Sequence, residues 1–242
     1  MFKLFIARLR NRWLRRRLQG EALPAAVTEN LYALDHLATD QNAKDLRYVI
    51  LDLETTGLSL SRDKVVSLSA VRMAEGRILL KDIFNSLVNP GREIPAATIK
   101  IHGIVPSMVD HAPGFDEVCD RFLEYLGTDI LVGYQVGFDL SFLNDCMKRK
   151  YGIFLQNLAL DIILMCNNVM IPAHSRKYVL SLRRNQGLDA MAARFGIQIP
   201  ERHTALGDAL ATAMIFQRIL AELEKKGAAN LRKLLHTGGV LK

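Results

Sequence analysis

The stretch Tyr48-Val-Ile-Leu-Asp-Leu-Glu-Thr-Thr-Gly57 is the clearest structural signal in this chain of 242 residues. Its apolar positions are typical of a β-strand buried on both faces, and the Thr-Thr-Gly turn ends that strand. Because side chains alternate along a strand, Asp52 and Glu54 share one face. Two like charges there need a positive partner, usually a divalent metal ion, unless the strand end is solvated.

A second acidic position follows a short apolar strand. In the run Leu131-Val-Gly-Tyr-Gln-Val-Gly-Phe-Asp139, a glycine-containing turn leads from this strand into a helix with apolar residues at helical spacing. Asp139 lies at the start of that helix, where an N-cap would need the same residue type. Position alone therefore leaves two interpretations open, a capping residue and a metal ligand.

The third segment is His203-Thr-Ala-Leu-Gly-Asp208, at the start of a late helix that is apolar almost all round. Asp208 begins one of its apolar stripes, and a carboxylate in that setting needs a partner or a metal ion. His203 lies five residues earlier, at or just before the helix start. A histidine in that position, taken singly, is also compatible with a surface or capping role.

Together these motifs resemble the DEDDh family of 3′-to-5′ exonucleases, which includes the proofreading epsilon subunit of bacterial DNA polymerase III, ribonuclease T and oligoribonuclease. The resemblance extends over roughly residues 47–223 and includes Ile101-His-Gly-Ile104. Some relatives have tyrosine where this chain has Thr204, so the histidine subclass is the match. The pair Tyr134-Gln135 departs from the His-Asn that is frequent in the family, at positions that line the substrate cleft.

The resemblance implies a site with two divalent ions, Mg²⁺ or Mn²⁺, a pair that can activate water and stabilise both reacting oxygens of a phosphodiester. The implied metal ligands are Asp52, Glu54, Asp139 and Asp208. His203 would be the general base, since the pKa of histidine near neutrality suits that role. The implied substrate-binding residues are Thr55, Gly57, Leu58, His102 and Phe138, with Leu58 against the terminal base and His102 near the terminal nucleotide.

The implied activity is hydrolysis at the 3′ end of single-stranded DNA, releasing nucleoside 5′-monophosphates, of a DNA repair or proofreading type. A 3′-5′ exoribonuclease of the same family is an alternative, and contact with the 2′-hydroxyl would distinguish the two. A nuclease-fold nucleic-acid-binding scaffold without catalysis is a third hypothesis. The presence of His203 argues against it, because such a module needs no general base.

The order of expected elements predicts an α/β fold. Three strands come first, at 47–53, 64–74 and 77–88, and two further strands at 129–133 and 157–160 alternate with helices. Helices are expected at 115–126, 139–150, 161–169, 187–195 and 206–225. This order predicts a mixed five-stranded sheet flanked by helices on both faces. The ribonuclease-H-like exonuclease fold of the resembled family agrees with it.

The charge of its first residues and the extent of the resemblance divide the chain into a basic amphipathic N-terminal extension at 1–44, an expected exonuclease domain at 45–226 and a short C-terminal tail at 227–242. The net charge of +7 comes from residues 1–20, which have seven basic residues and no acidic one. Three widely spaced cysteines show no zinc or disulfide pattern, so we expect reduced thiols in a cytoplasmic protein. The absence of an apolar run of about 18 residues predicts no integral membrane segment.

The basic extension has three possible roles. Phe2, Phe5, Leu9 and Trp13 share one helical face, so residues 1–20 form an amphipathic helix. The helix could dock on the core through this apolar stripe, contact nucleic acid, or lie on a membrane surface. A second basic segment, at 171–186, is either a solvated loop or a phosphate-contacting lip beside the active site.

Overall fold

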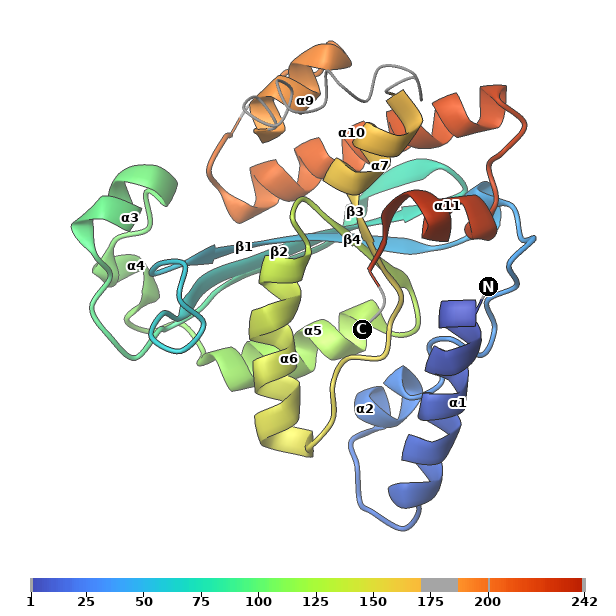
Figure 1. Cartoon of the computed structure of the whole chain (residues 1–242). Coiled ribbons are helices and arrows are strands. Elements are labelled where there is room, and N and C mark those ends of the chain that lie inside the picture. Colours follow the sequence, from blue (N-terminus) through green and yellow to red (C-terminus); the bar gives the residue numbers. More distant parts are fainter. Residues whose placement is uncertain (1, 171–186, 200, 241–242) are drawn as a thin grey trace.

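The computed structural model describes residues 2–170, 187–199 and 201–240, which form one sheet with helices on both sides (Figure 1). The described strands are β1 Tyr48–Thr55, β2 Val65–Ala74, β3 Arg77–Leu87, β4 Ile130–Gly133, β5 Ala159–Asp161 and β6 Gly239–Val240. The described helices are α1 Phe2–Arg17, α2 Ala25–Asn30, the 3₁₀ turn Ala43–Asp45, α3 Ala96–His102, α4 Pro106–Val109, α5 Phe115–Leu126, α6 Gly137–Tyr151, α7 Ile162–Met170, α9 Leu188–Arg194, α10 Ala205–Lys225 and α11 Leu231–Gly238.

The sheet is mixed, as the order of expected elements predicted. The described strands have the order β3-β2-β1-β4-β5-β6; β1, β2 and β3 are antiparallel, whereas β4 and β5 run parallel to β1. The expected number of five strands is wrong, because β6 adds a sixth at the edge, antiparallel to β5. This strand has two residues, too few for a pattern of alternating side chains to reveal it.

Alternate residues of β1 face two different cores. Tyr48 and Ile50 pack in the core beneath α7, α9, α10 and α11, whereas Val49 and Leu51 pack in the core beneath α5 and α6. In Figure 1 the first group of helices lies above the sheet and the second below it. Since the strand alternates, the even positions that follow Ile50 also face α10. The acidic pair of β1 therefore projects toward this helix.

The position of α10 along β1 follows from an aromatic contact. The rings of Tyr48 and Phe216 meet edge to face, with centroids 4.9 Å apart. From Phe216 back to Asp208 the helix rises about 12 Å, and from Tyr48 to Asp52 the strand advances about 13 Å. Because the two lengths match, the first turn of α10 lies over the acidic part of β1.

The N-terminal helix docks on the core, but the face predicted for docking is wrong. Leu4, on the opposite side of α1 from Leu9, is buried in the main core. Arg8 and Arg15 donate hydrogen bonds to the backbone carbonyls of Leu34 and Leu31, at 3.0 and 2.9 Å. The two carbonyl groups lie in and after the last turn of α2, where they need hydrogen-bond donors. Arginine side chains supply such donors, whereas apolar side chains could not. Phe5, Leu9 and Trp13 of the predicted stripe face solvent instead.

The C-terminal residues complete the domain around α7. Leu231 and Leu234 of α11 are fully buried, and the chain then enters β6 beside β5. Within the described part of the chain, no helix is long and apolar enough to cross a bilayer. The basic segment at 171–186, with its two alternative roles, lies outside the described residues.

A buried ion pair between β2 and the end of α5 is expected to matter for stability. Arg72 pairs with buried Asp129 and with Asp82, and its guanidinium stacks on Tyr125 at 4.5 Å. Arg72→Ala should lower the free energy of unfolding by about 3 kcal/mol, because Asp129 loses its main partner inside the protein. Urea denaturation measures this change. The control Arg77→Ala, at an exposed position, should cost less than about 0.5 kcal/mol, and equal losses would contradict the prediction.

Candidate active site

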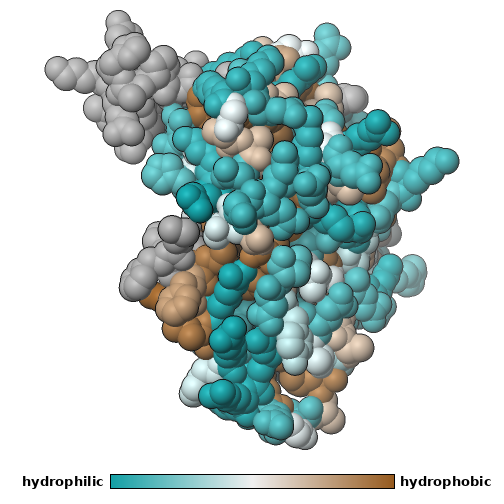
Figure 2. Space-filling view, turned by 90° about the vertical axis from the view of Figure 1, so that its right-hand side faces the viewer, coloured by the Kyte–Doolittle hydropathy of each residue, from teal (hydrophilic) through white to brown (hydrophobic). Residues whose placement is uncertain are grey.

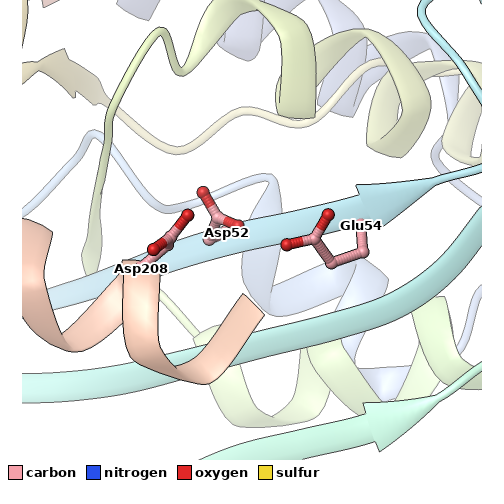
Figure 3. Close-up of side chains that lie close together, drawn as sticks. All are labelled: Asp52, Glu54 and Asp208. Carbon is pink, nitrogen blue, oxygen red and sulfur yellow. The ribbon is translucent and has the colours of Figure 1, made fainter. Parts of the chain in front are cut away.

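Three carboxylates predicted from the sequence meet between β1 and α10. Oxygen atoms of Asp52, Glu54 and Asp208 all lie within 4.8 Å of one another. Figure 3 shows Asp52 and Glu54 on the strand and Asp208 on the helix, with the three carboxylates directed toward one another. Asp208 is buried and the other two are half-buried. The strand spacing and the helix position on β1 together produce this cluster.

The fourth predicted carboxylate borders the same cluster. Asp139 is buried in the first turn of α6, and its carboxylate accepts hydrogen bonds from its own backbone amide and from that of Leu53. Its negative charge raises the pKa of Asp52. The structure thus brings three of the four predicted acidic residues into one cluster, with Asp139 where its charge acts on Asp52, although Asp52 and Asp208 are 156 positions apart in the sequence.

Crowding and burial raise the pKa values of these carboxyl groups. Burial, and then the neighbouring carboxylates of Asp139, Asp208 and Glu54, hold the pKa of Asp52 well above its ordinary range. Burial, with the charge of Asp208, raises the pKa of Glu54 to about 8. Protons or cations therefore bind favourably to these carboxylates at neutral pH.

Arg202 supplies part of that charge, and the sequence analysis did not single it out. Its guanidinium forms an ion pair with Asp208, and its Nε atom donates to Asp189 of α9 at 2.6 Å. Its charge lowers the pKa values of Asp52 and Glu54. Only its place directly before His203 could have pointed to it, and a basic residue in a connecting segment is a weak signal.

The cluster fits a divalent cation. The Oδ1 atom of Asp208 is buried and has no hydrogen-bond partner, although Arg202 pairs with the same carboxylate. An unsatisfied buried carboxylate oxygen beside two further carboxylates is an all-oxygen donor set, which suits hard ions such as Mg²⁺ or Mn²⁺. Asp52, Glu54 and Asp208 could hold such an ion, and Asp139 lies beside them.

His203 lies in the turn that leads into α10. It is exposed, has a φ of 62°, and forms no hydrogen bond or ion pair within the described residues. The next residue, Thr204, caps the helix by accepting a hydrogen bond from the backbone amide of Gly207 at 3.0 Å. Because His203 has a left-handed backbone conformation and Thr204 caps the helix directly after it, the chain changes direction at His203. The imidazole therefore lies at the surface, about one helical turn before Asp208.

The predicted substrate-binding residues after β1 form an ordered turn. The hydroxyl of Thr55 donates to the carbonyl oxygen of Gly57 at 2.7 Å. Leu58 follows with 87% of its side chain exposed, the highest value among the exposed large hydrophobic residues. A leucine so fully exposed makes little contribution to the core, so it is available to contact a ligand.

The other two predicted substrate-binding residues are more enclosed. His102 is buried at the end of α3; its Nδ1 accepts a hydrogen bond from the amide of Ile104 at 3.0 Å, and its Nε2 has no partner. Burial lowers its pKa, so the ring is neutral near pH 7. Phe138 is partly buried, and its ring packs edge to face on Phe142 at 5.2 Å. Both side chains are therefore less accessible than that of Leu58.

Asp161, at the end of β5, holds the turn that carries Asp139. Its carboxylate accepts hydrogen bonds from backbone amides on two segments, those of Ile163 at 2.8 Å and of Gln135 and Val136. Gln135 has a φ of 51°, so these bonds stabilise an unfavourable backbone conformation. From the sequence, Asp161 is expected only to begin a helix.

The model of a family described as Exonuclease (RNase_T) matches residues 49–216. The chain belongs to this exonuclease family. It is 39% identical over 196 residues to a DNA polymerase III subunit epsilon-like protein of Rhodobacter capsulatus, a match that covers 78% of this chain and 26% of that protein.

Other similar proteins agree with this assignment. A PolC-type DNA polymerase III of Bacillus subtilis is 32% identical over 180 residues, or 74% of this chain and 12% of that protein. The nuclease domain of 3′hExo, a DEDDh family member bound to rAMP, has the same fold with a TM-score of 0.60 and 17% identity, covering 78% of this chain and 97% of that one. The resemblance to epsilon-like proteins and the ribonuclease-H-like fold predicted from the sequence are confirmed. The chain spans about a quarter or less of the length of these two polymerase III relatives.

Removal of divalent ions with EDTA should make the stability of the protein fall as pH rises. The raised pKa values of Asp52, Asp139 and Glu54 mean that the folded protein binds more protons than the unfolded chain between about pH 4 and 8. Their contribution to stability is full below pH 4 and is lost as pH approaches 8. Added Mg²⁺ should therefore raise the melting temperature more at pH 8 than at pH 5.

A comparison with and without Mg²⁺ isolates these groups. Burial lowers the pKa values of His36 and His102, so they contribute the opposite slope under both conditions. Glu54→Gln should flatten the pH dependence in EDTA. Identical slopes in EDTA and in Mg²⁺ would show that the carboxylate cluster does not bind the ion.

Gly207 should be required for the shape of the site. A Cβ atom at this buried position would overlap the backbone carbonyl oxygen of Glu201. Gly207→Ala must therefore move the turn that carries Arg202 and His203, and a shift of about 1 Å can lower a rate about a hundredfold. Nuclease rates on a labelled oligonucleotide measure the effect. The control Gly114→Ala, which meets no atom within 4 Å, should keep its activity, and an active Gly207→Ala variant would contradict the prediction.

Proposed function

We propose that this protein is a metal-dependent 3′-5′ exonuclease that hydrolyses phosphodiester bonds at the end of single-stranded DNA and releases nucleoside 5′-monophosphates. The observation that supports this most strongly is the cluster of Asp52, Glu54 and Asp208, with Asp139 beside it and a buried oxygen that lacks a partner. Such a cluster is costly to a folded protein unless it binds cations, so its presence calls for a function.

In this proposal the four carboxylates hold two ions, Mg²⁺ or Mn²⁺. Bound ions would lower the pKa of the attacking water and neutralise charge on the phosphate. Asp52 lies between the other carboxylates, and the charges of Asp139, Asp208 and Glu54 all act on it, so it is the residue best placed to contact both ions. Asp139, held by two backbone amides, would support the second position.

His203 is proposed to accept the proton of the attacking water. It is exposed and unpaired within the described residues, so its imidazole is available to water and substrate. The left-handed turn and the cap at Thr204 fix its backbone relative to Asp208, which limits the volume that the ring can sample. The third hypothesis from the sequence, a nucleic-acid-binding scaffold without catalysis, would not require a histidine in this position beside the carboxylates.

The preference for a strand end is argued from Leu58. This exposed side chain lies at the turn directly after β1, close in sequence to Asp52 and Glu54. An apolar side chain at that place can stack on the terminal base, so a strand end would bind more favourably than an internal segment. His102, whose buried Nε2 atom has no partner within the described residues, is proposed to approach the terminal nucleotide.

DNA is proposed as the substrate ahead of RNA. Both polymerase III relatives carry DNA polymerase in their names, and this supports DNA for the present chain. The rAMP-bound 3′hExo domain keeps the alternative of a 3′-5′ exoribonuclease open to test. A matched pair of DNA and RNA oligonucleotides distinguishes them.

The deciding experiment uses purified protein with Mg²⁺ or Mn²⁺ and 5′-labelled or 3′-labelled oligonucleotides of both kinds. A 3′-5′ exonuclease should shorten 5′-labelled strands stepwise and release labelled mononucleotide at once from 3′-labelled strands. Asp52→Asn should lower the rate at least about a hundredfold, because a neutral amide weakens both metal positions, and excess EDTA should abolish it. His203→Ala should lower kcat by about 10² to 10⁴, with little change in metal affinity.

Controls separate this function from its alternatives. Asp145→Asn, at an exposed position of α6 outside the carboxylate cluster, should keep most of the activity. A circular single strand should resist the enzyme, and rapid nicking of it would favour an endonuclease. A folded His203→Ala variant with full kcat would rule out the proposed general base. Faster turnover of RNA than of DNA would select the exoribonuclease.

A further inference from the structure

The outer face of α1 has no partner in the protein. Successive helical residues are about 100° apart, so Phe5, Leu9 and Trp13 lie on the side of the helix opposite Leu4. Their side chains are 59%, 46% and 62% exposed. Because α1 docks on the core through the face that carries Leu4, this apolar surface has a fixed position and faces solvent. On the side of the molecule shown in Figure 2, hydrophobic surface gathers in the lower half beside hydrophilic surface.

Arginines border this apolar face on both sides. Arg12 flanks it on one edge, and Arg16 lies at its C-terminal end, at an angular position between those of Phe5 and Leu9. Neither arginine side chain forms an ion pair or hydrogen bond within the described residues. Arg17 flanks the other edge and lies over the ring of Trp13 at 5.8 Å. Residues 1–20 contain no aspartate or glutamate. The surface therefore combines an apolar centre with a positive rim.

An open hollow next to the helix strengthens the positive character of one edge. It lies between the C-terminal half of α1 and the segment 20–32, and Arg12, Arg15 and Arg16 line it. Arg15 is already paired with Asp35 at 2.8 Å, which leaves the other two to receive an anion. A phosphate group bound there would lie beside the exposed apolar side chains.

We propose that α1 binds this protein to the surface of a membrane that contains anionic lipids. Leucine, isoleucine and phenylalanine side chains would enter the acyl boundary, Trp13 would lie at the headgroup level, and the arginines would contact lipid phosphates. A nucleic-acid backbone would satisfy the arginines but leave the aliphatic centre in water. A convex single helix also presents no groove for a peptide. The combination of an aliphatic centre with a cationic rim fits a bilayer surface.

This position is compatible with the proposed nuclease site. In Figure 1, α1 lies at the lower right, whereas the N-terminal end of α10 and the C-terminal end of β1 lie at the left. A membrane bound along the outer face of α1 would therefore leave the carboxylate cluster open. Binding should determine where the enzyme works and leave its turnover unchanged.

The test is flotation of the full chain with vesicles of phosphatidylcholine alone or with about 30 mol% phosphatidylglycerol. The wild type should float with the anionic vesicles, less so at high salt, and not with the neutral ones. Leu9→Glu should lower the bound fraction at least about tenfold, because it places a charge in the centre of the face. Arg12→Glu combined with Arg16→Glu should lower it by a similar factor.

A matched control places the same charge elsewhere. Leu80 of β3 is 67% exposed, and Leu80→Glu should float like the wild type. All variants should keep the wild-type melting temperature and the wild-type rate on a short oligonucleotide. Absence of flotation with anionic vesicles at low salt, or flotation unchanged by Leu9→Glu, would overturn the proposal. So would a dimer in light scattering that Leu9→Glu dissociates, because a second copy would then cover the face.

Discussion

The packing of α10 against the even-numbered face of β1 determines where every part of the candidate site lies. The edge-to-face contact of Tyr48 with Phe216 sets the position of the helix along the strand. Because rise along the helix and advance along the strand are nearly equal over this distance, Asp208 comes to lie opposite Asp52. Gly207 allows the close approach of the turn before the helix, which carries Arg202 and His203. The site thus depends on hydrophobic packing at some distance from it.

The same packing forces acidic groups together at a cost. Four carboxylates in and beside one cluster would repel each other strongly if all were ionised, and burial adds to the penalty. Arg202 offsets part of this cost through Asp208, and its second bond to Asp189 ties α9 to the site. Bound divalent ions would offset the rest, so metal binding and stability are coupled in this architecture.

The N-terminal helix separates two tasks between its faces. Its inner face supplies Leu4 to the core and uses Arg8 and Arg15 to cap backbone carbonyls, so the helix is part of the fold. Its outer face keeps apolar and cationic side chains exposed. A rigidly docked helix binds a surface with less loss of conformational entropy than a mobile arm, which favours a binding role for that face.

The sequence by itself determined most of the strand and helix pattern, the mixed sheet and the acidic residues proposed for the site, but it did not indicate α11 or β6. The predicted features follow from local rules, since alternation puts Asp52 and Glu54 on one face and apolar periodicity places Asp208 on α10. Tertiary structure alone decided that Arg202 and Asp161 support the site, because both act through partners distant in the chain or on other elements. It also decided which face of α1 docks. A helix whose two faces are both partly apolar has no local preference, and only the carbonyl groups and buried leucines of the core select one.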